Sequence, residues 1–362
     1  MRTPRTLHIG IVGLGAIGRT HVRVLRIADP TVVLSAVDPG AGAAAAARSL
    51  GITHYSDLDD MLDGARPDAV VVAAPTDDHL AIASACIARG IPVLVEKPIA
   101  ANVADAALLT RRAAEAGVPL LVGHHRRYNP VVQDAARHVA RGEIGRVTAV
   151  TVMYASRKPD TYFDIPWHRE PQGGGPILIN LIHEIDQLRF ILGEIVSVQA
   201  IASSGVRHLP VEDTAVVLLR FASGALGTIS LSDCVASPWS YDLVSGEFDL
   251  IADRPGLIGR GTDDTHFIMG TEGSLTLPRL RRFRFGGEPG WHQPLEVREA
   301  GRVGANVYAL QAAHFLDVVT GAASPRVTGE DATRSLAVTL AIKEAAATGR
   351  EVPVPDGIVP SP

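Results

Sequence analysis

A glycine-rich turn near the N-terminus constrains the fold of this chain more than any other feature. The apolar run LHIGIV at 7–12 is typical of a buried strand. It leads directly into GLGAIG at 13–18, and a helical pattern then extends to about residue 28. Strand, turn and helix in this order predict the first unit of a doubly wound parallel sheet.

The glycines of this turn have separate roles in binding a dinucleotide. Gly13 permits the tight turn, Gly15 lets the backbone approach a pyrophosphate, and Gly18 lets the helix pack closely on the strand. The phosphates would then meet the first N–H groups of the helix, around Ala16 and Ile17, where the helix dipole favours anions.

A carboxylate follows the second predicted strand. Residues 32–37 form that strand, and Asp38 comes directly after it. A carboxylate there can accept hydrogen bonds from the adenine ribose hydroxyls and repels a 2′-phosphate. Asp38 therefore favours NAD over NADP, and the alternative is that Asp38, which precedes Pro39, only forms a turn.

The first third of the chain continues to alternate strands with helices. Further strands are expected at 69–74, 93–95 and 119–123. The helices are expected at 41–50, 56–62, 77–89 and 102–116. This alternation predicts a parallel sheet covered on both faces, and we assign residues 1–125 to an NAD-binding Rossmann domain.

Residues 126–362 follow a different plan, that of a substrate-binding and oligomerisation domain of the α+β class. Strand-like runs succeed one another, which predicts a large open sheet that is mainly antiparallel. The expected strands are 147–155, 195–203, 214–221, 225–235, 265–277 and 280–285. The expected helices are 131–140, 177–192, 305–320 and 329–347. A nucleotide fold followed by such a sheet is a dehydrogenase plan, in which the sheet forms the substrate wall.

Composition argues against several other classes of protein. The net charge of −5 provides no basic field to attract nucleic acid or an anionic membrane surface. No apolar run approaches the roughly 20 residues that span a bilayer. The two cysteines, Cys86 and Cys234, form no zinc motif, so we expect no metal and a cytoplasmic location.

Two segments carry candidate chemistry. Glu96-Lys97-Pro98 follows the strand at 93–95, and open α/β sheets bind ligands at the carboxyl ends of their strands. Lys97 is therefore either a solvated loop residue or a catalytic one. In the helix at 177–192, Asn180 and His183 share one stripe, and His183 is either a core histidine or a functional one.

Together these segments resemble the glucose–fructose oxidoreductase/inositol dehydrogenase (Gfo/Idh/MocA) family. The resemblance is carried by GLGAIG with Asp38, PTDDH at 75–79, Glu-Lys-Pro at 96–98, GHHRRYNP at 123–130, GGG…HEIDQLRFILG at 173–193 and GTEGSL at 270–275. These segments span most of the chain in the family's order. The resemblance implies further cofactor contacts at Pro75, Thr76, His79, Glu96 and Lys97.

The resemblance also implies a catalytic pair. Lys97 matches the family's active-site lysine, whose ammonium stabilises the alkoxide character that develops on the substrate oxygen. His183 matches the helix histidine that is the expected general base. The implied reaction oxidises a secondary hydroxyl of a sugar, sugar derivative or cyclitol to a ketone and reduces NAD.

One position departs from the family pattern. Many members carry an aspartate four residues before the histidine, where this chain has Ile179, and Asn180 follows it. Because neither residue brings a negative charge, the charge of Lys97 acts unopposed at these positions. We therefore expect the pKa of His183 to lie at or below its ordinary value.

Polar and aromatic residues of the second domain are expected to line the substrate site. The candidates are Arg126, Tyr128, Tyr162, Asp164, Trp167, His168, Arg169, Asn180 and Trp239. The loop at 162–169 could equally form an oligomer contact. Arg126 and Arg169 leave open an acidic substrate, such as a carboxylated aromatic-pathway intermediate, and a cyclic dihydrodiol is a related alternative.

Two further expectations concern the class of protein and its assembly. A non-catalytic NAD-sensing regulator is an alternative on this fold, but the presence of both Lys97 and His183 argues against it. The resemblance suggests a homodimer or homotetramer formed through the open sheet of the second domain.

Overall fold

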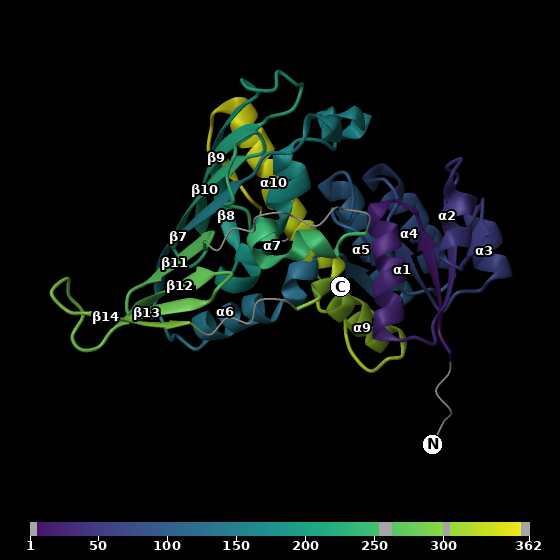
Figure 1. Ribbon diagram of the computed structural model, residues 1–362, viewed down its shortest axis with the longest axis horizontal. Helices are drawn as coiled ribbons and strands as arrows, with labels where there is room; N and C mark the ends of the chain where they lie inside the picture. The colour runs from purple at the N-terminus through teal and green to yellow at the C-terminus, as the bar shows by residue number, and fades with distance from the viewer. Residues whose placement is uncertain (1–5, 253–262, 300–304, 356–362) are drawn as a thin grey trace.

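Six parallel strands form the N-terminal sheet of the computed structural model, which describes residues 6–252, 263–299 and 305–355 (Figure 1). In spatial order they are β3 (Thr53–Tyr55), β2 (Val33–Val37), β1 (His8–Val12), β4 (Ala69–Val72), β5 (Val93–Val95) and β6 (Leu120–Val122). The sheet is wound outward in both directions from the neighbours β1 and β4. Their carboxyl ends are therefore the switch point at which sheets of this kind bind ligands.

The expected Rossmann elements are present, with one addition. Strand β3 was not predicted, because Thr-His-Tyr is short and lacks an apolar run. The helices are α1 (Ala16–Ala28), α2 (Ala43–Ser49), α3 (Leu58–Gly64), α4 (His79–Ala88) and α5 (Val103–Ala116). Side-chain caps fix two of these starts, since Asp57 accepts from the first turn of α3 and Asn102 from that of α5.

Within the described ranges, nine strands form the second sheet. In spatial order they are β14 (Leu295–Glu299), β13 (Arg281–Phe285), β12 (Gly273–Leu277), β11 (His266–Gly270), β7 (Val147–Ala155), β10 (Leu226–Ser232), β9 (Thr214–Phe221), β8 (Ile195–Ser203) and β15 (Val352–Pro353). All neighbours are antiparallel except β7 and β10. The run expected at 265–277 is a hairpin of two strands, and β14 and β15 were not predicted.

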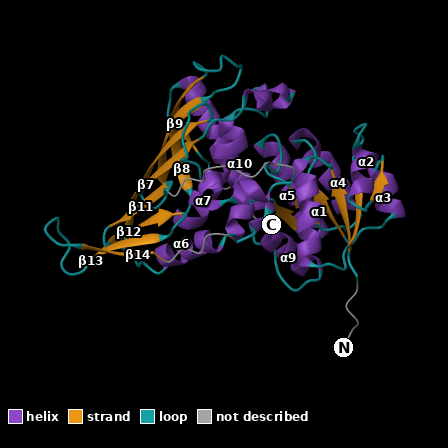
Figure 2. Cartoon of the chain, viewed as in Figure 1, coloured by secondary structure: helices purple, strands orange, loops and turns teal. Residues whose placement is uncertain are grey.

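Helices separate the two sheets. Figure 2 shows α6 (Pro130–Ala140), α7 (Ile182–Leu192) and α10 (Gly329–Thr348) on the face of the second sheet that looks toward the N-terminal domain. Helix α9 (Val307–Val319) returns to that domain, where Phe315 shares a core with Ile9 and Leu25. Residues after 306 therefore do not belong to the second domain alone.

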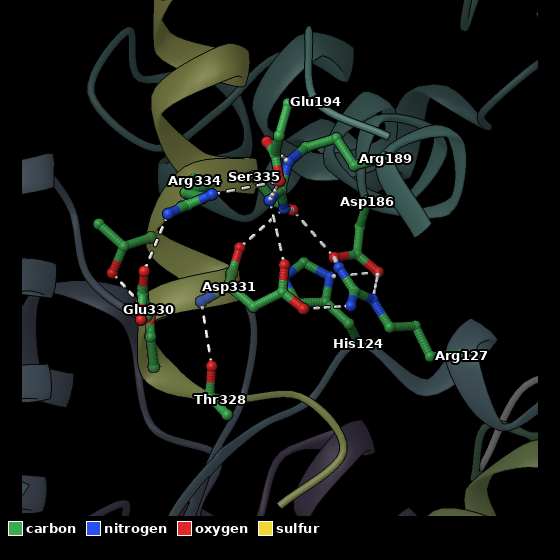
Figure 3. A network of polar contacts seen from close by, with 12 residues as sticks. His124, Arg127, Asp186, Arg189, Glu194, Thr328, Glu330, Asp331, Arg334 and Ser335 are labelled. Atoms are coloured by element: carbon green, nitrogen blue, oxygen red, sulfur yellow. Dashed lines mark hydrogen bonds and ion pairs between the residues drawn. The ribbon is translucent and has the colours of Figure 1, made fainter. Parts of the chain in front are cut away.

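A buried ionic network links α7 and α10 to the segment that follows β6 (Figure 3). Arg127, which follows β6, donates two hydrogen bonds to Asp186 of α7, with N–O distances of 2.8 and 2.7 Å. Ser335 of α10 donates to the same carboxylate at 2.9 Å. Asp331 of α10 pairs with both Arg127 and Arg189. This network fixes α7 against α10 and the segment after β6.

In the described ranges, no helix combines the length and the apolar character needed to cross a membrane.

Candidate active site

The glycine-rich turn has the form that a bound dinucleotide requires. Gly13 has φ +93°, and a Cβ on it would lie 2.5 Å from the carbonyl oxygen of Ala73. A Cβ on Gly18 would lie 1.9 Å from the carbonyl oxygen of Gly13, so only glycine allows α1 to pack this closely. A Cβ on Gly15 would meet nothing within 4 Å, and no side chain caps α1. The helix N-terminus is thus available to a phosphate.

Asp38 connects two loops at the edge of this turn. One carboxylate oxygen accepts from the N–H of Leu14 at 2.7 Å, and the other accepts from the N–H of Gly40 at 2.8 Å. The contact with Gly40 is that of a turn former, and the contact with Leu14 brings the carboxylate to the glycine-rich loop. The two interpretations of Asp38 are therefore compatible.

A cleft lies between the domains. It is lined from the N-terminal domain by Thr76 and Lys97, and from the second domain by Trp167, Gly173 and Ile179 among others. The Gly-rich run before α7 and the loop after β5 thus meet here.

Two of the predicted cofactor contacts have structural roles. His79 is buried, and its ring nitrogens lie 2.9 and 3.0 Å from the carbonyl oxygens of Pro98 and Ala74, so its ring holds the loops after β4 and β5 together. Glu96 is buried and lies 2.7 Å from His21 of α1. Burial acts to raise the pKa of Glu96, but the hydrogen bond from His21 holds it below its ordinary value.

Lys97 is partly buried and lines the cleft. Its Nζ donates to the carbonyl oxygen of Ile179 at 3.1 Å. Burial lowers the pKa of Lys97 to about 8, although Glu96 and Asp242 act in the opposite direction. Lys97 is therefore not the solvated loop residue of the alternative interpretation.

His183 lies at the start of α7, and its ring centroid is 5.1 Å from that of His125. Its pKa is well below the ordinary range, because the ring is buried and because Lys97 and His125 add positive charge nearby. The direction expected for its pKa is confirmed, but burial is the largest cause, and the sequence did not reveal it. A neutral imidazole at neutral pH can accept a proton.

The turn that precedes His183 differs from the prediction. Residues Ile177–Leu181 form a π-helical turn rather than the first part of a continuous α-helix. The N–H of Ile177, at its start, donates to the Glu212 carboxylate at 2.9 Å. Turns of this kind occur often at functional sites. Here the turn presents the Ile179 carbonyl to Lys97 and the Asn180 side chain to a second lysine.

That second lysine, Lys158, was missed as a candidate. Its Nζ donates to Oδ1 of Asn180 at 2.7 Å and lies 3.3 Å from Asp233. Burial lowers the pKa of Lys158, against the opposing effect of Asp233. A signal was present in the composition, since only three of the 34 lysine and arginine residues are lysine. Two of those three lie beside this π-turn.

The structure corrects two predicted substrate contacts. Arg126 is 1 % exposed and forms ion pairs with three carboxylates, those of Glu184, Asp242 and Glu247. Tyr128 is also buried, in the core of the N-terminal domain, where Arg326 lies over its ring. Both residues stabilise the fold, because their polar or aromatic groups are enclosed by protein.

The loop at 156–176 supplies the remaining candidates. Tyr162 stacks on His168 with centroids 3.8 Å apart, and Nδ1 of His168 lies 2.6 Å from the carbonyl oxygen of Tyr162. This pair supports the loop, while the exposed Trp167 reaches the cleft. The other candidates, Asp164, Arg169 and Trp239, are exposed, and none of them is among the cleft-lining residues.

Both parts of the chain match models of one oxidoreductase family. The family's "NAD-binding Rossmann fold" matches residues 7–124, and its "C-terminal alpha/beta domain" matches residues 136–354. The chain belongs to the Gfo/Idh/MocA oxidoreductase family. It is therefore an NAD-dependent oxidoreductase with an N-terminal cofactor domain, as the sequence predicted.

Individual relatives agree with this assignment. Inositol 2-dehydrogenase 1 of Saccharopolyspora erythraea is 32% identical over 293 residues, which is 79% of this chain and 78% of that protein. The 1,5-anhydro-D-fructose reductase of Ensifer adhaerens is 30% identical and covers 96% of this chain and 99% of its own length. The WlbA dehydrogenase of Bordetella pertussis, solved with NADH and UDP-GlcNAcA, has a TM-score of 0.78 at 26% identity, covering 97% of this chain and 99% of that one.

Proposed function

We propose that this protein oxidises a secondary hydroxyl of a sugar, sugar derivative or cyclitol to a ketone, with NAD as the hydride acceptor. One observation carries the proposal. Lys97, at the carboxyl end of β5, donates a hydrogen bond to the Ile179 carbonyl in the π-turn that leads into His183. The positive charge of Lys97 also lowers the pKa of that histidine. A lysine and a neutral histidine thus lie close enough to act on one substrate hydroxyl at the carboxyl end of β5.

The arrangement supports a division of labour between the two residues. A nicotinamide bound in this cleft supplies the acceptor for the hydride. The Lys97 ammonium donates a hydrogen bond to the substrate oxygen and stabilises its developing negative charge. The neutral His183 accepts the hydroxyl proton, so a C–H and an O–H bond break while a C=O bond forms. Gly15, Ala16 and Ile17 would hold the pyrophosphate, and Asp38 the adenine ribose.

The test is reduction of NAD, followed by the absorbance of NADH, with a panel of sugars, inositols and ring diols. We expect turnover with at least one hydroxylated ring compound and a preference for NAD over NADP. NADH binding without turnover of any compound would instead support the regulatory alternative. A cytoplasmic location stays a prediction of the sequence.

We also propose that the protein forms a dimer or tetramer through its second sheet. Four outward-facing side chains of three adjacent strands are apolar and exposed, namely Ile201 of β8, Val216 and Leu218 of β9, and Leu226 of β10. Exposed apolar side chains gathered on neighbouring strands are typical of a protein contact. Light scattering should give a mass of two or four chains for the wild type and a smaller one for Leu218→Glu. A monomeric wild type would contradict the proposal.

A further inference from the structure

We propose that Lys158 is a substrate-binding residue and that the substrate carries a carboxylate close to the carbon that is oxidised. This inference rests on the proposed function, because it names the class of substrate for the same site. It depends on where Lys158 lies, on how that residue is held, and on the hydrogen-bonding groups that the site offers.

Lys158 is held in place through both its backbone and its side chain. Its backbone N–H donates to the carbonyl oxygen of Asp233 at 2.9 Å, and its carbonyl accepts from Arg207 at 2.8 Å. The side chain lies 12% exposed between Asn180, Asp233 and the ring of Tyr162, whose centroid is 4.7 Å from Nζ. A lysine fixed in this way has already lost the conformational freedom that ligand binding would otherwise remove.

The buried carboxylate nearest to Lys158 is shared. Asp233 is buried and pairs with both Lys158 and Arg207, and the second carboxylate of Arg207, that of Asp160, is exposed to solvent. Asp242 affects the pKa of both Lys97 and Lys158, but it is itself ion-paired with Arg126. Two ammonium groups thus flank the π-turn, and position 179, where the family resemblance led us to expect an aspartate, holds Ile179.

The hydrogen-bonding groups around the turn are mostly donors. An ammonium has three N–H donors and no acceptor. The described contacts use one donor of Lys97 and two of Lys158. Because Lys158 must donate to Oδ1 of Asn180, the NH₂ group of Asn180 points away from Lys158 and adds two more donors. The neutral His183 is the acceptor that the reaction needs.

A carboxylate complements such a site better than a hydroxyl does. Its two oxygens accept hydrogen bonds and donate none, whereas each hydroxyl of a neutral polyol also brings a donor that requires an acceptor. A hydrogen bond to a charged group strengthens binding by about tenfold or more. The sequence suggested that Arg126 and Arg169 could bind an acidic substrate. We now expect Lys158 to bind its carboxylate instead.

The test uses D-glucuronate and D-glucose, which differ only in the carboxylate at C6. Their binding to the complex of the enzyme with NADH is measured by calorimetry. We expect the wild type to bind glucuronate at least about tenfold more tightly than glucose, which is the lower end of a charged hydrogen bond. Lys158→Met should abolish this preference, and Lys158→Arg should keep most of it. The control Arg111→Met, which removes an exposed charge from α5, should leave it unchanged.

Equal or negligible binding of both sugars by the wild type would overturn the proposal, as would a preference that survives Lys158→Met. These readouts need no turnover. An enzyme that prefers glucuronate in binding yet reduces NAD with no compound would contradict the proposed function and leave the charge inference standing. An enzyme that turns over neutral rings and shows no preference for the acid would contradict only the charge inference.

Discussion

At the scale of single residues, the site depends on how burial shifts proton equilibria. Burial lowers the pKa of His183 so that its ring is neutral at neutral pH, and it lowers the pKa of Lys97 to about 8. In both cases burial is the largest cause of the shift. At neutral pH His183 therefore carries no proton to lose and Lys97 is largely protonated, so the imidazole can accept a proton while the ammonium donates a hydrogen bond to the substrate oxygen.

The scarcity of lysine makes the pKa of Lys97 directly measurable. With selectively ¹³C-labelled lysine, the protein should give three side-chain signals, from Lys97, Lys158 and Lys343. We expect one signal to titrate near pH 8 and to disappear in Lys97→Arg. Because the protonated form stabilises the alkoxide, kcat/KM for oxidation should fall as the pH rises through that value. Titration of all three signals above about pH 10 would contradict this account.

Cofactor choice is a second prediction at this scale. Asp38→Ser removes a carboxylate that would hydrogen-bond the ribose and repel a 2′-phosphate. We expect weaker NAD binding and a gain of about tenfold or more in the ratio of NADP to NAD use, measured as kcat/KM, because one charged hydrogen bond is lost. A wild type that already prefers NADP would show that Asp38 is only a turn former.

At the scale of elements, the π-turn before α7 differs from the continuous α-helix that the sequence predicted. The segment Ile-Leu-Ile-Asn-Leu is apolar at four of its five positions, so its periodicity does not distinguish an α-helix from a π-turn. The Rossmann strands were predictable because buried parallel strands are continuous apolar runs. Strand β14 was not, because its apolar residues are only Leu295 and Val297, too short an alternation to mark a strand, and all five of its residues are exposed.

The absence of a carboxylate in this turn can be tested by adding one. In Asn180→Asp and in Ile179→Asp, a negative charge next to His183 should stabilise the imidazolium and raise its pKa. The measurement is an NMR titration of His183, assigned with His183→Asn. An unchanged titration in both variants would show that burial alone sets the pKa of this histidine.

The same limits apply to the site residues. Lys97 and His183 could be predicted because local motifs and a family resemblance marked them. Arg126 was misjudged because its partners, Glu184, Asp242 and Glu247, lie between 58 and 121 residues away in sequence and only the fold brings them together. Lys158 was missed because its contacts with Asn180 and Asp233 are long-range in the same way.

At the scale of the whole molecule, charge as well as apolar packing holds α7 and α10 on the segment that follows the N-terminal sheet. Asp186 receives two hydrogen bonds from Arg127 and one from Ser335, so it links three elements of the junction. Removal of one partner from such a buried pair leaves an uncompensated charge. The position of His183, one turn before Asp186 on α7, therefore depends on this network.

The network should contribute strongly to stability. We expect Asp186→Ala to lower the free energy of unfolding by about 3–5 kcal/mol in urea denaturation. The control Asp134→Ala breaks the exposed pair with Arg137 and should cost less than about 1 kcal/mol. Equal losses in the two variants would show that the junction does not depend on this ion pair.

We expect Lys97 and His183 to be needed for turnover but not for folding or for cofactor binding. The most direct test is to measure kcat and NADH affinity together in Lys97→Ala and His183→Asn, with any compound that the wild type oxidises. We predict that kcat falls by roughly 10² or more in each variant, while the affinity for NADH stays within a few-fold of the wild type. A variant that keeps near-wild-type kcat would contradict the role assigned to that residue.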